Sequence, residues 1–153
     1  MFAVTKKLKG PLTEEWVFRS CMCPLLLQAG YSHGTIIFCS PIFFGAAHLH
    51  HIIQHLHKQG QELKNAYFQV LFQLFYTSVF GSYSAFLFLR TGHFISPFIA
   101  HSFCNYMGFP RFHVLTDHPY QKLLWSSFVV GLVLFFVLLF PLTDPLYYQS
   151  IYW

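Results

Sequence analysis

The chain has 153 residues, of which 55% are hydrophobic and only 9% are charged, and its mean hydropathy is +0.47. A soluble domain carries about a quarter charged residues, so this composition excludes an ordinary soluble globular protein and predicts a membrane protein. The net charge of +4 comes from basic residues between the apolar runs, without a basic stripe, which argues against nucleic-acid binding.

Long apolar runs predict the helices, because a hydrocarbon core about 30 Å thick requires roughly 20 residues of helix. Five such runs occur in the chain, at residues 12–28, 35–55, 65–89, 93–109 and 123–142. The predicted fold class is therefore all-α, an integral membrane bundle with about five membrane segments. No internal repeat or second domain is evident.

Glycine, proline and capping residues mark the ends and bends of these segments. Thr13 is the expected N-cap of the first segment, and Gly30 is expected to end it. Pro41 and Gly45 lie inside the second segment, where membrane helices tolerate such residues at close helix contacts. The fifth segment is apolar all round and is expected to face lipid.

One membrane-embedded core, 12–142, is predicted between a basic N-terminal flank, 1–11, and a C-terminal tail, 143–153. No cleavable signal peptide is expected, because no apolar stretch follows directly on the basic start. The four cysteines form no CxxC pair and lie in or beside apolar runs, which predicts buried, reduced thiols.

Ionisable side chains in membrane segments cost about 2.5–3.5 kcal/mol each to insert and are therefore candidates for function. Glu15 and Arg19 are four residues apart and can pair on one helix face, whereas Glu14 points to another face. A paired carboxylate stays ionised, while an unpaired neighbour in a drier site can exchange protons. The alternative interpretation is a helix start that carries surface acids.

A group of histidines follows the second segment. His48, His51 and His55 share one helix face and could bind zinc, which prefers three or four nitrogen or sulfur ligands. The zincin motif HExxH is absent from the sequence, and most of these histidines are expected at the membrane interface or in a loop. No cofactor is therefore predicted, and zinc remains the less favoured alternative.

His101 and Asn105 are one helical turn apart in an otherwise apolar segment. Two neighbouring hydrogen-bond donors can form an oxyanion hole. The alternative is a hydrogen bond between two membrane helices, a common use of polar residues in bilayers. The pair by itself does not decide between these interpretations.

Taken in chain order, three motifs read EExxxR, FxxxH and HxxxN, with their defining residues at Glu14, Glu15, Arg19, Phe44, His48, His101 and Asn105. This pattern resembles the CAAX protease and bacteriocin-processing family. The stretches PLTEEWVFR, FFGAAHLHHII, FGSYSAFLFLRTGH and HSFCNYMGFP resemble its eukaryotic type II CAAX prenyl proteases, the Ras-converting enzymes of the endoplasmic reticulum. The resemblance spans roughly residues 10–146.

The resemblance implies an intramembrane endopeptidase, multi-pass in the endoplasmic reticulum membrane, that removes the last three residues from prenylated CAAX proteins such as Ras. The implied partners are these substrates and the lipid bilayer, and no metal is implied. The implied catalytic residues are Glu14, Glu15, His48, His101 and Asn105, with Arg19 and Phe44 in support.

The resemblance also implies a role for each side chain. Glu14 and His48 would activate the attacking water, and His101 and Asn105 would stabilise the tetrahedral oxyanion. Glu15 would assist or orient, and Arg19 would hold a carboxylate in place. The prenyl chain would enter from lipid into a cavity open to the cytosol, for which the candidate lining residues are Phe44, Tyr76, Phe80 and Tyr83.

Full-length family members have several more membrane segments before the double glutamate, whereas this sequence begins about a dozen residues upstream of it. The alternative hypothesis is therefore a truncated, non-catalytic membrane form or a scaffold of the same family. A zinc-dependent membrane hydrolase is the remaining alternative.

Overall fold

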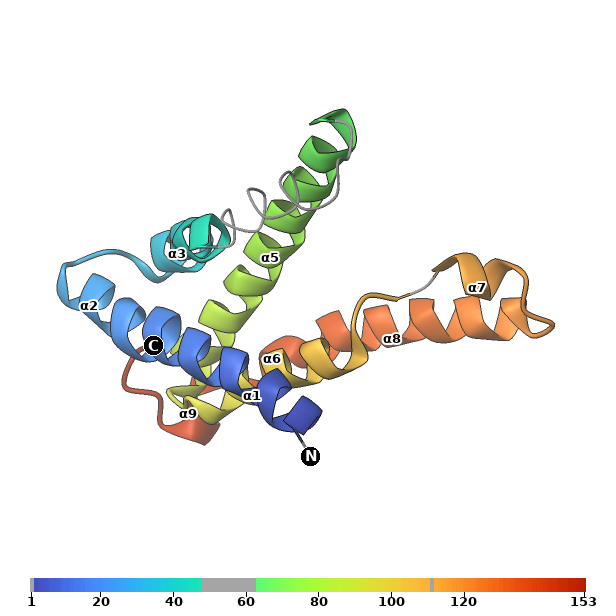
Figure 1. The fold of residues 1–153 in the computed structure, drawn as a ribbon. Helices are drawn as coiled ribbons and strands as arrows, with labels where there is room; N and C mark the ends of the chain where they lie inside the picture. Colours follow the sequence, from blue (N-terminus) through green and yellow to red (C-terminus); the bar gives the residue numbers. More distant parts are fainter. Residues whose placement is uncertain (1, 48–62, 111) are drawn as a thin grey trace.

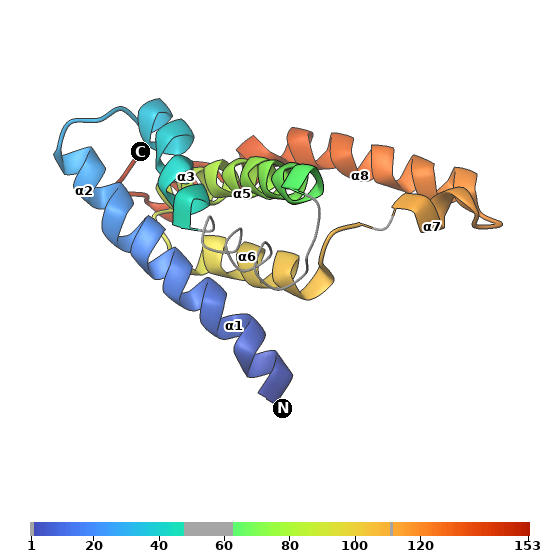
Figure 2. The ribbon, with the colours of Figure 1, turned by 45° about the horizontal axis from the view of Figure 1, so that its top comes forward.

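The computed structural model describes residues 2–47, 63–110 and 112–153, which are entirely helical in their regular elements and contain no strand. This confirms an all-helical fold for the described part of the chain. The helices form an open arrangement, in which α8, with α7 beside it, extends away from the other helices (Figure 1). Figure 2 shows the same arrangement from a second direction.

The chain begins with a helical rod in three consecutive parts: α1 (Phe2–Glu15), η1 (Trp16–Cys21) and α2 (Met22–Gln28) (Figure 1, blue). The middle part, η1, is a wider π-helical stretch, a feature that is frequent at functional sites. The rod ends at Gly30, whose φ of +85° places it in the left-handed region, as the sequence predicted.

The predicted start of this first helix was wrong. Helix α1 begins before residue 12, so Thr13 is not an N-cap, and its hydroxyl instead donates to the carbonyls of Lys9 and Gly10 in the preceding turn. Pro11 lies inside the helix and its side chain is buried. The burial of its ring offsets the hydrogen bond that a proline removes from a helix.

Helices α3 (His33–Ala47) and α5 (Leu63–Thr91) cross in close contact. A Cβ atom on Gly45 would lie 2.7 Å from Leu74 Cδ1, and one on Gly81 would lie 2.9 Å from Pro41 Cβ. Both distances are shorter than real Cβ contacts. The predicted use of Pro41 and Gly45 at a close helix contact is therefore confirmed.

Helix α6 (Ile95–Met107) turns back after α5 and packs against both α1 and α5. The turn is made at Gly92, which has a φ of +67° that few side-chain-bearing residues adopt. The predicted end of the third segment at Gly92 is thus confirmed. This turn brings the polar residues of α6 against the end of α1, where the two glutamates lie.

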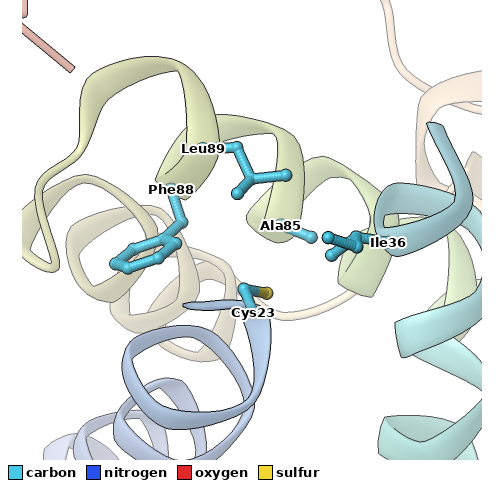
Figure 3. Close-up of a cluster of buried hydrophobic side chains, with 5 residues drawn as sticks. All are labelled: Cys23, Ile36, Ala85, Phe88 and Leu89. Atoms are coloured by element: carbon cyan, nitrogen blue, oxygen red, sulfur yellow. The ribbon is translucent and has the colours of Figure 1, made fainter. Parts of the chain in front are cut away.

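A small hydrophobic core joins α2, α3 and α5. It consists of Cys23, Ile36, Ala85, Phe88 and Leu89 (Figure 3). Tyr152 stacks on Phe88 with ring centroids 5.1 Å apart, so the C-terminal residues return to this core. The core therefore fixes the α2, α3 and α5 positions beside the site described below.

The chain ends with α7 (Phe112–Thr116), α8 (Gln121–Leu142) and α9 (Pro145–Tyr148). Helix α8 has no buried residue, as predicted for a lipid-facing span. Within the described residues, the 67–91 part of α5 and the whole of α8 are long and apolar enough to cross a membrane. Both observations are consistent with a membrane protein.

The predicted burial of the cysteines was correct only for Cys23. All four cysteines are free, but Cys21, Cys39 and Cys104 are exposed on the surfaces of their helices. An apolar stretch of sequence does not reveal which side of a helix the fold covers, and this is why the burial prediction failed for three of the four.

Candidate active site

The centre of the candidate site is Glu15, the last residue of α1, whose side chain is 0% exposed. Its Oε1 accepts from Arg19 Nη1 at 3.2 Å, and its Oε2 lies 3.1 Å from Arg19 Nε. The predicted pairing of Glu15 with Arg19 is confirmed. An ion pair this deeply buried is stable only when its remaining hydrogen-bonding positions are also satisfied.

Two further helices supply the remaining contacts of Glu15. Ser84 of α5 donates through Oγ to Glu15 Oε2 at 2.7 Å, and His101 Nδ1 of α6 lies 2.6 Å from Glu15 Oε1. An ionised carboxylate has about four acceptor positions. Two contacts to Arg19, one to Ser84 and one to His101 occupy them, so Glu15 is a structural anion that ties three helices together.

His101 lies between the two adjacent glutamates. While its Nδ1 faces Glu15, its Nε2 lies 3.8 Å from Oε2 of Glu14. That separation is longer than a direct hydrogen bond. Because the carboxylate of Glu15 only accepts, Nδ1 carries a proton, and in the neutral imidazole Nε2 is then the free acceptor facing Glu14.

Aromatic rings pack against the Arg19 guanidinium and against the His101 ring. Phe44 of α3 is buried and packs under the guanidinium of Arg19, with Cζ 4.6 Å from the ring centroid. Its edge also faces the His101 ring at a centroid distance of 6.2 Å, and Phe80 lies 5.0 Å from His101. Phe44 therefore supports both the ion pair and the histidine.

Glu14 differs from its neighbour because its side chain is 33% exposed and lines a cavity of about 740 Å³. His101 and Asn105 line the same cavity from α6, one helical turn apart. The adjacent glutamates thus have separate environments, as expected from their positions on the helix: Glu15 is enclosed by protein, and Glu14 faces an open space.

The cavity is lined by polar and by aromatic side chains. Its aromatic lining includes Phe44, Phe72, Tyr76, Phe80 and Phe109. Phe72 and Tyr76 of α5 pack with Phe109, with ring centroids 5.5 and 6.1 Å from it. Aromatic pairs at such distances form rigid apolar surfaces. The cavity therefore places carboxylate, imidazole and amide groups beside an aromatic wall.

The structure brings together Glu14, Glu15, Arg19, Phe44, His101 and Asn105 from the predicted set. His48, like His51 and His55, lies outside the described residues. No group of three or more His, Cys, Asp or Glu side chains suited to a metal ion occurs in the described part of the chain. Of the four aromatic residues expected to line the cavity, Tyr83 instead lines a separate space against α8.

Comparison with known proteins identifies the family. The family described as type II CAAX prenyl endopeptidase Rce1-like matches residues 2–107, more than half of the chain. The chain belongs to this family. No solved structure matches it.

Curated relatives support the assignment to the CAAX prenyl endopeptidase family. The chain is 49% identical over 142 residues to CAAX prenyl protease 2 of Homo sapiens, covering 93% of this chain and 43% of the relative. It is 48% identical to the Arabidopsis thaliana protein of the same name, over 92% of this chain and 44% of the relative. The chain spans less than half the length of these two relatives.

A more distant relative of the same family is the probable CAAX prenyl protease 2 of Schizosaccharomyces pombe. It is 37% identical over 135 residues, which cover 88% of this chain and 50% of the relative. The family match at residues 2–107 includes the helices that form the candidate site, namely α1, η1, α3, α5 and α6.

Sequence reasoning missed the contact that Ser84 makes in this candidate site. The residue lies 69 positions from Glu15 and is surrounded in sequence by apolar and aromatic residues. The only available signal was its position among the small residues of the FGSYSAF stretch. Gln73, Thr77 and Cys104, which also line the cavity, were likewise not singled out.

Proposed function

We propose that this chain is the catalytic part of a membrane endopeptidase that removes the C-terminal tripeptide from prenylated CAAX proteins such as Ras. The observation that carries the proposal is the placement of Glu14, His101 and Asn105 around one cavity that aromatic side chains also line. A prenylated peptide has the matching chemistry, since a scissile amide lies close to a long apolar chain.

In the proposed reaction, Glu14 takes a proton from a water molecule held in the cavity. The water oxygen attacks the scissile carbonyl carbon, and the carbonyl oxygen becomes an oxyanion. Glu14 then returns the proton to the nitrogen of the departing tripeptide as the carbon–nitrogen bond breaks. A carboxylate that is partly shielded from water suits this exchange of roles. His48 remains the proposed second group on the attacking water.

His101 and Asn105 are proposed to stabilise the oxyanion. The amide of Asn105 can donate without changing its charge. His101 can donate from Nε2 only as the doubly protonated imidazolium, whose Nδ1 then donates to the carboxylate of Glu15. Glu15 is therefore proposed to orient His101 and balance its charge, with Arg19 and Phe44 in support.

The aromatic side chains of the cavity are proposed to accept the prenyl group. Phe72 and Tyr76 line the cavity and pack against Phe109, which lines it too. We further propose about five membrane segments, on the basis of the five apolar runs in the sequence. We also propose a location in the endoplasmic reticulum membrane, as the family resemblance implies. A membrane location suits the proposed substrates, because their lipid chains hold them at membranes.

The deciding experiment is a cleavage assay with membranes that contain this chain as the sole added protein. A farnesylated CAAX peptide should release its last three residues, detected by mass spectrometry, and membranes with the Glu14→Gln variant should release them at least about 10²-fold more slowly. The same peptide without a prenyl group tests the role of the aromatic wall. Release by a longer protein that includes this chain, but not by the chain itself, would support the non-catalytic alternative.

A further inference from the structure

One turn of α5 contacts both members of the buried ion pair. The hydroxyl of Ser84 donates to Glu15, and the carbonyl of Gly81 accepts from Arg19 Nη2 at 3.1 Å. These positions are three residues apart and therefore lie on the same helix face. The Ser84 side chain is fully buried, so water cannot replace its hydrogen bond.

The backbone behind this contact has no room to shift. A Cβ atom on Gly81 would lie 2.9 Å from Pro41 Cβ and 3.4 Å from Arg19 Nη2. Helix α5 is thus held against α3 on one side and against the ion pair on the other. The position of Ser84 relative to Glu15 is consequently set by the packing of two helices.

The contacts of Glu15 determine what His101 presents to the cavity. Arg19 and Ser84 together fill three of about four acceptor positions on the carboxylate. The remaining position accepts from Nδ1 of His101, which leaves Nε2 as the nitrogen on the side of Glu14. Without the hydroxyl of Ser84, Glu15 could rotate, and the ring of His101 would lose its fixed partner.

We propose that Ser84 is a positioning residue that, with Gly81, fixes the orientation and tautomer of His101 through Glu15. The proposal rests on the proposed endopeptidase function for the reaction that it serves. The competing interpretation is an ordinary hydrogen bond between membrane helices, which would contribute to folding alone.

A matched pair of substitutions in this chain, assayed in membranes, separates the two roles. Ser84→Thr and Ser84→Val add the same volume, and only Thr retains the hydroxyl. The valine variant should lower kcat for a farnesylated CAAX peptide about tenfold relative to the threonine variant, with KM within about twofold, because a hydrogen bond to a charged group is lost. Turnover is compared at equal amounts of folded protein.

Thr91→Val provides the control for a buried hydroxyl on the same helix. Thr91 is also buried and lies about two helical turns beyond Ser84, but its hydroxyl donates to the carbonyl of Leu87 within α5. This variant should keep the parental kcat. Equal kcat values for Ser84→Thr and Ser84→Val would overturn the positioning role.

A second measurement does not depend on turnover. In ¹⁵N-histidine-labelled protein, the His101 resonances, assigned by their loss in His101→Gln, should show the neutral ring protonated at Nδ1. The Ser84→Val variant should show a mixture of tautomers, and an unchanged tautomer would overturn the proposal. If the parent protein cleaved no prenylated peptide, the endopeptidase function would fail, while the tautomer measurement would still decide the role of Ser84.

Discussion

Two buried arginines of the described residues are used in different ways. Arg19 is 1% exposed, is paired with the carboxylate of Glu15, and lies over the ring of Phe44. Arg90 is 9% exposed and donates to the carbonyls of Phe140 and Thr143 and to the Thr143 hydroxyl. Burying either charge in an apolar protein is unfavourable in free energy unless the charge is paired and hydrogen-bonded.

The two arginines differ in whether the groups that they contact also orient other side chains. The carbonyls that Arg90 contacts belong to the end of α8, where they have no helical partner, and a cation there also complements the helix dipole. Three aromatic rings, Phe86, Phe140 and Trp153, enclose the same guanidinium. Arg90 therefore joins α8 to α5.

The partner of Arg19, in contrast, has acceptor positions that reach beyond the pair. Glu15 uses them for Ser84 and for His101, and His101 lines the cavity. This comparison teaches that a buried charge by itself does not mark a functional site in a membrane protein. The informative feature is a buried charge whose partner orients a side chain toward open space.

The largest expected effect comes from Glu14→Gln in the Arg19 region. An amide cannot take the proton of the attacking water, so cleavage of a farnesylated CAAX peptide should fall by about 10²–10⁴-fold, which is the contribution of general-base catalysis. The matched control near Arg90 is Asp144→Asn, at the residue whose side chain caps α9 by accepting from Leu146 N. This variant should cleave the peptide at the parental rate. Full activity of folded Glu14→Gln protein would remove Glu14 as the base.

The next largest effect is expected for Asn105→Leu, which keeps the approximate size of the side chain and suits a membrane helix. Loss of an oxyanion donor should lower turnover about 10²–10³-fold while the affinity for the prenylated peptide stays close to the parent value. Turnover and peptide binding are measured at matched folded concentration. A variant with altered stability and unchanged turnover would show that Asn105 serves helix packing.

Replacing each arginine by leucine tests the comparison directly. Arg19→Leu leaves the buried carboxylate of Glu15 without its arginine, which should lower the free energy of unfolding by about 3–5 kcal/mol and lower the turnover of the protein that folds. Arg90→Leu should cost about 2 kcal/mol through lost charged hydrogen bonds, with turnover retained in the folded fraction. Thermal unfolding in detergent and cleavage rates provide the measurements. Equal loss of turnover in both variants would contradict the distinction.

A smaller effect is expected from the aromatic residues that line the cavity. Phe109→Leu removes a flat ring that packs against Phe72 and Tyr76, so KM for a farnesylated peptide should rise about fivefold with kcat unchanged. Phe136 of α8 is similarly exposed and does not line the cavity, so Phe136→Leu serves as the control. An identical KM in both variants would show that the aromatic wall does not contact the prenyl group.

No effect is expected from removing metal ions. The proposed reaction uses only side chains, and Asn105 is a poor ligand for zinc. Treatment with a chelator should leave the cleavage rate unchanged, and metal analysis should find less than one zinc per active protein. Activity that is lost to the chelator and restored by zinc would favour the zinc-dependent alternative.

Features that depend on neighbouring residues could be predicted from the sequence. Spacing alone indicated that Glu15 pairs with Arg19 and that Glu14 faces elsewhere, because positions four apart share a helix face. Glycines marked the ends of α2 and α5, and the even apolarity of α8 indicated a helix without a buried face. Each of these follows from helix geometry within a few turns.

Features that depend on which helix faces meet were decided by tertiary structure alone. The start of α1 before Pro11, the partnership of Ser84 with Glu15 across 69 positions, and the place of His101 between two glutamates all follow from packing between distant segments. Close approach at Gly45 and Gly81 selects the face of α5 that contacts the ion pair. Periodicity defines the faces of a helix, but complementary shape between distant helices determines which of those faces come into contact.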